Sequence, residues 1–368
     1  MNLTQPQQIL LALLKLALWK TPPDKALFEN AGDDIWKEVY RLSAEQGVKA
    51  IAYDGVTLLP LELQPAHSIL FQWGIHVDGI ERRFEKELQV ANEMADIFAK
   101  NDIKMLLFKG LEMAQYYPSP EHREFGDIDF YLFGKKEEGE QLLLEAGATK
   151  NELQCDRHTK LLYKGILIEN HEYILPEGEL YNVPLLEERL MNALKNVNLS
   201  NNPLVKNALS PSLDFSILLM SSHTFWHFLG RNLLLRYLCD WALFLTANRG
   251  AIDFDSWRRV TIHSGFVKFA DALSALAVKY LDLNPEFAPP FETNSAIEEK
   301  ILQNMFNPLY FPINKNHSWT EKLRLKLKNF KYIRWKYDEL FSTPQFYKII
   351  RRSIMLYIRR PMRILKMS

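Results

Sequence analysis

Two aspartates separated by a single residue, Asp127 and Asp129, lie in an otherwise apolar stretch, residues 126–132 (GDIDFYL). We predict a β-strand here. Because side chains alternate across a strand, the two carboxylates share one face while Ile128 and Phe130 share the other. Carboxylates held a few ångströms apart repel each other unless a cation lies between them. The pattern therefore predicts a divalent metal site, in which oxygen ligands favour Mg²⁺ or Mn²⁺ over Zn²⁺.

A turn that could hold an anion precedes these aspartates. A short apolar run, residues 105–108, ends at Lys109-Gly110, and a helical stretch, residues 111–117, follows until two prolines end it. The free N–H groups and positive dipole end of a helix attract anions, and Gly110 lets a phosphate approach the backbone. A phosphate site followed by same-face aspartates is the arrangement expected for transfer of a nucleotidyl group from a triphosphate.

Four groups of residues in this region follow one another in a recognisable order: Lys109-Gly110, Tyr117-Pro118, Arg123 and residues 126–129 (GDID). They resemble the "KG … YP … R … GDID" signature of a bacterial family of uncharacterised nucleotidyltransferases, which belongs to the polymerase-beta-like nucleotidyltransferase superfamily. The resemblance covers residues 36–257. One departure is Leu111, which stands where the superfamily usually has a second small residue.

The resemblance implies an α+β fold, in which a small mixed β-sheet core has helical layers before and after it. It also implies metal-dependent transfer of an NMP group from a nucleoside triphosphate to an acceptor, with release of pyrophosphate and with Mg²⁺ or Mn²⁺ as cofactor. Asp127 and Asp129 would be catalytic residues and metal ligands. The nucleotide would be held by Lys109, Gly110, Arg123 and Gly126.

A third carboxylate follows in a predicted β-hairpin. Residues 159–163 and 166–171 flank Lys164-Gly165, a hairpin turn signal. In the resembling family the second arm carries the third acid, so Glu169 would complete the metal site or accept the proton of the attacking group, with His171 on its face. The alternatives are a solvated edge strand for the aspartates and the polar face of an exposed hairpin for Glu169 and His171.

The remaining segments are predicted to position this core. Residues 1–100 form an N-terminal helical region. A first helix, residues 8–20, has four leucines on one face (Leu10, Leu11, Leu14 and Leu18), and further helices follow at residues 34–46 and 75–100. Residues 101–200 form the core, which a polar connection over residues 182–209 separates from a C-terminal helical region, residues 201–315. Residues 316–368 form a basic amphipathic tail. Three basic residues of the helix at residues 75–100, Arg82, Arg83 and Lys86, either form a solvated face or include one that contacts a substrate phosphate.

Two helices, residues 213–229 and 231–247, carry candidates for an acceptor pocket, which could also include His171. His223 and His227 have the spacing of zinc ligands, but we predict a hydrogen-bonded pair without zinc, because no third ligand is in sight. Arg236 and Asp240 are four residues apart, so either an intrahelical ion pair or a pocket wall is possible.

Charge is segregated along the chain. Residues 321–368 carry fourteen basic and three acidic side chains, whereas the whole chain has 45 of each, so the preceding residues carry a net charge of −11. Interleaved aromatic residues make the tail amphipathic. It could lie on an anionic membrane surface, bind nucleic acid, or fold back onto the acidic body.

Composition limits the setting of the protein. The chain has two cysteines, Cys155 and Cys239, which argues against a disulfide framework and for a location in the reducing cytoplasm. If the tail binds lipid, the protein would lie at the membrane surface. We identify neither a secretion signal nor a membrane span. Besides the enzyme, a second hypothesis is a non-catalytic binding or scaffold protein that keeps the fold and reaches a membrane or nucleic acid through its tail.

Overall fold

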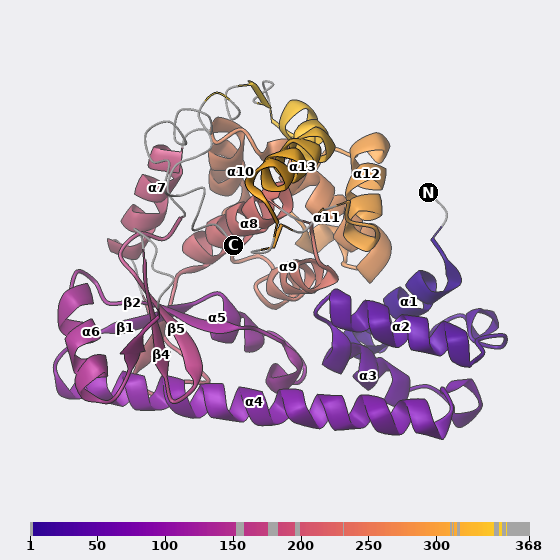
Figure 1. Cartoon of the computed structure of the whole chain (residues 1–368), viewed down its shortest axis with the longest axis horizontal. Coiled ribbons are helices and arrows are strands. Elements are labelled where there is room, and N and C mark those ends of the chain that lie inside the picture. The colour runs from indigo at the N-terminus through magenta and orange to yellow at the C-terminus, as the bar shows by residue number, and fades with distance from the viewer. Residues whose placement is uncertain are drawn as a thin grey trace.

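The computed structural model describes residues 3–151, 158–175, 183–195, 199–230, 232–309, 311, 313–314, 317–341, 346–347 and 351. Within them, one mixed β-sheet combines with helices that precede, connect and follow its strands. Figure 1 shows the sheet between one long helix, α4 (His67–Lys100), and a body of helices from the second half of the chain. The predicted α+β class is confirmed.

Among the residues that the structure describes, the sheet has seven strands: β1 (Met105–Phe108), β2 (Asp127–Tyr131), β3 (Thr149–Lys150), β4 (His158–Tyr163), β5 (Ile166–His171), β6 (Ser200–Asn201) and β7 (Ala208–Ser210). Their order is β3-β4-β5-β2-β1-β7-β6, with β2 antiparallel to β1 and parallel to β5. β4 and β5 form the predicted hairpin. Its turn residues Lys164 and Gly165 have φ values of 50° and 79°, as a two-residue turn matching the strand twist requires.

Three helices begin the chain: α1 (Gln5–Trp19), α2 (Asp33–Glu45) and α3 (Lys49–Thr57). The predicted leucine face of α1 is buried, and so are the other leucines of the helix, because α1 packs against α2, α3 and α11 (Val267–Leu281). The long helix α4 begins at His67, before the predicted residue 75, and its length lets it contact both α3 and β1 (Figure 1). On α4, Arg82 and Lys86 are exposed, as predicted for a solvated face.

The other α-helices are α5 (Gly110–Ala114), α6 (Lys136–Glu145), α7 (Val183–Lys195), α8 (Leu213–Gly230), α9 (Leu235–Ala247), α10 (Phe254–His263), α12 (Ser295–Phe306) and α13 (Trp319–Glu339). Short 3₁₀ turns are η1 (Lys25–Leu27), η2 (Leu61–Leu63), η3 (Pro120–His122) and η4 (Pro285–Phe287). Residues 182–209 are not the predicted polar connection: they include α7, β6 and β7, and β7 pairs with β1. The sheet therefore extends beyond residue 200, while the division into four regions stays a prediction.

The first part of the tail folds back. α13 packs against α8, and the fully buried Lys336 donates a hydrogen bond of 2.6 Å to the carbonyl oxygen of Phe228. Leu340 and Phe341 are buried in the same core. Fold-back is thus confirmed for this part, whereas most of residues 342–368 lie outside the described residues, as does Cys155. Cys239 is a buried free thiol, and none of the described helices is long and apolar enough to cross a membrane.

A buried histidine joins η3 to two helices of the N-terminal region. The ring nitrogens of His122 lie 2.7 Å from the Asp54 carboxylate of α3 and 2.9 Å from the Glu81 carboxylate of α4. Burial alone would lower the pKa of His122, but the two carboxylates raise it to about 9. The imidazolium therefore stabilises this junction at neutral pH.

We expect this contribution to disappear in mild alkali. Because the folded pKa exceeds the unfolded value, the contribution is complete below about pH 6.5 and is lost as the pH rises through about 9. His122→Gln should therefore lower the free energy of unfolding by about 2 kcal/mol at about pH 6 and by much less at about pH 9.5. Urea unfolding at both values measures the difference. The control is the same change at the exposed His67, and a pH-independent cost at His122 would contradict the prediction.

Candidate active site

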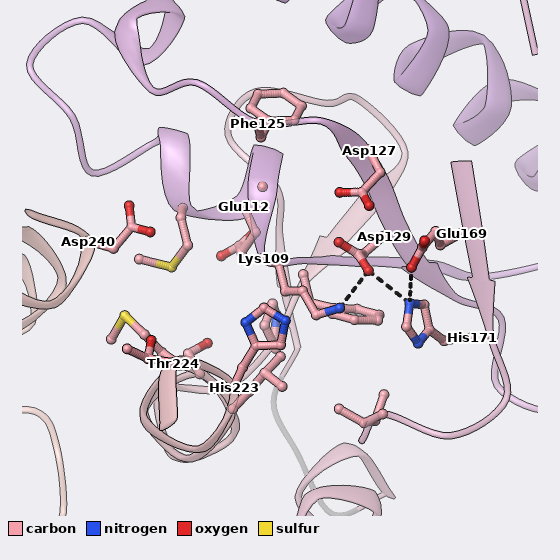
Figure 2. A pocket seen from close by; sticks show the side chains of 18 of the residues that line it. Lys109, Glu112, Phe125, Asp127, Asp129, Glu169, His171, His223, Thr224 and Asp240 are labelled. Carbon is pink, nitrogen blue, oxygen red and sulfur yellow. Dashed lines mark hydrogen bonds and ion pairs between the residues drawn. The ribbon is translucent and has the colours of Figure 1, made fainter. Parts of the chain in front are cut away.

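The three predicted acids converge on one face of the sheet. Asp127 and Asp129 lie on β2, and Glu169 on β5 is paired in register with Asp129. Asp129 and Glu169 are buried, whereas Asp127 is half-buried. All three line one pocket of about 410 Å³ between the sheet and helices α8 and α9 (Figure 2). The alternatives of a solvated edge strand and an exposed hairpin face are therefore wrong.

Basic side chains form ion pairs with two of these acids, Asp129 and Glu169. The Lys109 ammonium group and Nε2 of His171 lie 2.7 and 2.8 Å from the same oxygen, Oδ1 of Asp129 (Figure 2). Lys160 donates to Oε1 of Glu169. Sequence analysis did not identify Lys160, although it pairs directly with Glu169 across the hairpin. Asp127 makes no ion pair with any residue in the described ranges.

The acids differ in pKa for this reason. Burial, followed by repulsion from the other two carboxylates, raises the pKa of Asp127 to about 6. Burial would also raise that of Asp129, but Lys109 and His171 hold its pKa well below the usual range. For Glu169 the effect of burial is overcome by His171 and Lys160, and its pKa falls to about 2. At neutral pH the pocket thus contains one poorly compensated negative charge, on Asp127.

The turn before α5 has an unusual backbone. Lys109 has φ 61° and ψ −124°, a conformation that side-chain-bearing residues rarely adopt, and such strain clusters at functional sites. A Cβ on Gly110 would lie 3.0 Å from the Phe125 ring and 3.2 Å from the carbonyl oxygen of Asp127, so a larger residue fits there only if these neighbours shift. α5 ends at Ala114, earlier than the predicted residue 117. Gly126 also lines the pocket, and its carbonyl accepts a hydrogen bond from Arg83.

Arg123, predicted to hold phosphate, is instead tied to α9. Its guanidinium group donates to both carboxylate oxygens of Asp240, at 3.1 and 2.8 Å, and the Tyr117 hydroxyl donates to the same carboxylate at 2.7 Å. Arg123 and Asp240 are both buried. The intrahelical pair between Arg236 and Asp240 does not form, since Arg236 donates to the carbonyl oxygen of Glu124. These contacts fix the loop before β2 to the helical body.

One face of α8 forms the opposite wall. It contributes Phe215, Leu219, Met220, His223 and His227 to the pocket. Nε2 of His223 and Nε2 of His227 are 3.2 Å apart, which confirms the predicted hydrogen-bonded pair. Burial and the nearby Lys109 charge keep the pKa of His223 well below its usual value, so this imidazole is neutral at neutral pH and lies among apolar side chains. Figure 2 shows His223 facing Lys109.

Comparison with known families shows to which family this chain belongs. The sequence profile of the family described as "Uncharacterised nucleotidyltransferase" matches residues 33–282, more than half of the chain. The chain belongs to this family. The match includes the acids, the Lys109 turn and the α8–α9 wall, and it supports nucleotidyl transfer as the general function. No curated protein and no solved structure matches the chain.

This nucleotidyltransferase-family chain has a further buried acid behind the Lys109 turn. Glu112 on α5 accepts hydrogen bonds of 2.7 Å from both Asn202 and Ser210, and one from Gln115. Burial raises the pKa of Glu112 to about 8. It attaches α5, and hence the turn, to the β6–β7 edge. Sequence analysis missed it because neither of its distant partners has a recognisable motif.

His158 is a further residue of this pocket, besides Lys160 and Glu112, that sequence analysis missed. It begins β4 opposite His171, and the two rings stack with centroids 4.8 Å apart. Its Nε2 lies 3.4 Å from Oε2 of Glu169. Burial lowers the pKa of His158 to about 4, so the ring is neutral. Among the described residues, His158, Glu169 and His171 form a group whose ligand atoms all lie within 4.8 Å of one another, as a metal site requires.

Proposed function

We propose that this chain is a metal-dependent nucleotidyltransferase, which moves an NMP group from a nucleoside triphosphate to an acceptor and releases pyrophosphate. The observation that carries the proposal is the convergence of Asp127, Asp129 and Glu169, from adjacent parallel strands, beside the strained Lys109-Gly110 turn in one pocket. Phosphoryl chemistry depends mainly on positioning and on charge stabilisation, and both are available here.

The residues fit a divalent cation. Three carboxylates share the pocket, and burial together with repulsion from Asp129 and Glu169 raises the pKa of Asp127, so its carboxylate is left without a partner of opposite charge among the described residues. Oxygen donors of this kind suit Mg²⁺ or Mn²⁺, which Asp127, Asp129 and Glu169 would hold. When bound, the ion supplies neutralisation of phosphate charge and polarises the reacting oxygens.

The chain's own residues would divide the remaining tasks. Lys109, at the pocket surface, offers its ammonium group to phosphate oxygens, while Gly110 and Gly126 allow close approach of the substrate to the backbone. Arg123 would act by positioning, through Asp240. Glu169 stays ionised beside Lys160, which favours cation binding over proton transfer for this acid.

The acceptor site is proposed for the α8 wall. His171 and Asp240 are already bound to Asp129 and Arg123, which leaves His223 and the apolar side chains around it to contact an acceptor. Arg236 also lines the pocket. An acceptor with an apolar part and a hydroxyl or amine group matches this lining best.

Calorimetric titration of the four nucleoside triphosphates, each with and without Mg²⁺ or Mn²⁺, tests the proposal. We expect at least one triphosphate to bind only with the metal, because the site alone would repel its phosphates. Slow release of pyrophosphate without an acceptor would support catalysis further. If the wild-type protein binds no triphosphate under any of these conditions, the proposal of a nucleotidyltransferase is wrong.

A membrane-binding scaffold is the second candidate, and the outer face of α13 favours it. Leu323 and Leu327 are 43% and 62% exposed, and Arg324, Lys328 and Lys331 are exposed on the same side of the helix. Apolar side chains flanked by basic ones suit an anionic lipid surface better than nucleic acid.

For this candidate we expect salt-sensitive retention on anionic vesicles. Lys331→Gln should weaken it about fivefold and Leu327→Gln by a similar factor, because one charge or one buried leucine contributes about 1 kcal/mol or more. Leu61→Gln, at another highly exposed leucine, is the matched control. Cosedimentation at low and high salt measures retention. Equal retention of all variants, or binding to heparin alone, would refute lipid binding through α13.

A further inference from the structure

The His158–Glu169–His171 group introduces nitrogen ligands into a site where sequence patterns indicated only oxygen. We propose that this group binds a transition-metal ion, so that the cation of this protein has imidazole as well as carboxylate ligands and is selected over Mg²⁺. The inference rests on the proposed function only for the catalytic role of the ion. The binding site itself stands on the geometry of the three side chains.

His171 has the hydrogen bonding of a metal ligand. Its Nδ1 lies 3.1 Å from the carbonyl oxygen of Tyr173, which can only accept, so Nδ1 carries a proton. Its Nε2 faces Oδ1 of Asp129 at 2.8 Å and Oε2 of Glu169 at 3.6 Å. Ligating histidines typically donate one ring N–H to a backbone carbonyl and present the other nitrogen to the ion. A cation between the imidazole and the carboxylates would take the place of the second ring proton.

His158 supplies the second nitrogen. Its Nε2 is buried and has no hydrogen bond to any residue that the structure describes, and a buried polar atom in that state costs free energy. Because β4 and β5 place His158 directly opposite His171, both imidazoles lie on the face of the sheet that carries Glu169. Nε2 of His158 therefore faces Oε2 of Glu169 at 3.4 Å, and one ion could bind both atoms.

Glu169 divides its two oxygens between different partners. Oε1 accepts from Lys160, whereas Oε2 is the atom nearest to both imidazoles. The three ligand atoms lie within 4.8 Å of one another, which a single ion with bonds of about 2.1 Å spans after small side-chain shifts. Imidazole ligands suit manganese, cobalt and zinc, whereas Mg²⁺ prefers oxygen and water.

The test uses full-length protein, stripped with chelator and free of nucleotide. We expect Mn²⁺ to bind at least about tenfold more tightly than Mg²⁺ in calorimetry, and pulsed electron paramagnetic resonance of the Mn²⁺ form to show coupling to imidazole nitrogen. His158→Phe, which keeps a ring to stack on His171, should weaken Mn²⁺ binding at least about tenfold and reduce the nitrogen coupling. The melting temperature shows whether the His158→Phe variant is folded, and His158→Asn replaces it in the experiment if it is not. His67→Gln, at an exposed histidine, is the control.

Equal affinity for Mg²⁺ and Mn²⁺, or no nitrogen coupling in the wild type, would overturn the inference. The two proposals fail separately. Nitrogen coupling without triphosphate binding would support the metal site and contradict the transferase function. Nucleotide transfer with Mg²⁺ and without nitrogen coupling would support the transferase function and contradict the metal site.

Discussion

Asp129→Asn is expected to reduce nucleotidyl transfer at least about a thousandfold and to abolish cooperative binding of metal and triphosphate. The substitution keeps the shape of the side chain but removes the charge that Lys109 and His171 approach to within 2.8 Å. A cation in the pocket would lose one anionic ligand. Calorimetry with metal and triphosphate, together with pyrophosphate release, measures both effects. Equal binding by the variant and the wild type would mean that the site lies elsewhere.

The matched variant Asp127→Asn separates chemistry from stability. It should also abolish transfer, but its effect on the metal-free protein should be opposite. Burial and repulsion by the neighbouring carboxylates raise the pKa of Asp127 to about 6, so its neutralisation should raise the melting temperature slightly. Asp129→Asn should lower it, because Lys109 and His171 lose a buried counter-charge. Equal shifts in both variants would contradict this account of the charges.

Arg123→Met is expected to lower the free energy of unfolding by about 3–5 kcal/mol, because it leaves the Asp240 carboxylate buried without its counter-charge. Arg123 and Asp240 are 6% and 3% exposed, so water cannot replace the lost partner. The double variant Arg123→Met with Asp240→Leu should recover part of the loss. Urea denaturation of the wild type and both variants measures these differences.

An exposed pair provides the control for this experiment. Arg82 and Asp78 on α4 also form an ion pair, but their side chains are 68% and 57% exposed, so Arg82→Met should cost less than about 1 kcal/mol. A phosphate-binding role for Arg123 would have a different signature. Weaker triphosphate binding with unchanged stability would contradict the positioning role of Arg123.

The sequence by itself determined the local parts of the site. Alternation along a strand is a property of the backbone, so the pattern of residues 126–132 was enough to place Asp127 and Asp129 on one face. The Lys164-Gly165 turn likewise fixed the hairpin, because few residue pairs accept positive φ at both positions. The second hairpin arm of the resembling family then added Glu169, with His171 on the same face, and the structure brings both to Asp129.

The tertiary structure decided which distant groups meet. Arg123 and Asp240 are 117 residues apart, and the competing partner Arg236, only one helical turn from Asp240, was the more natural expectation from sequence. The register of the hairpin brought His158 and Lys160 to Glu169, and packing against three helices buried α1 nearly all round. Local periodicity reports how a segment folds on its own, whereas these contacts depend on how separate segments pack. Only the assembled chain therefore reveals that lysines and imidazoles surround the acids of the site.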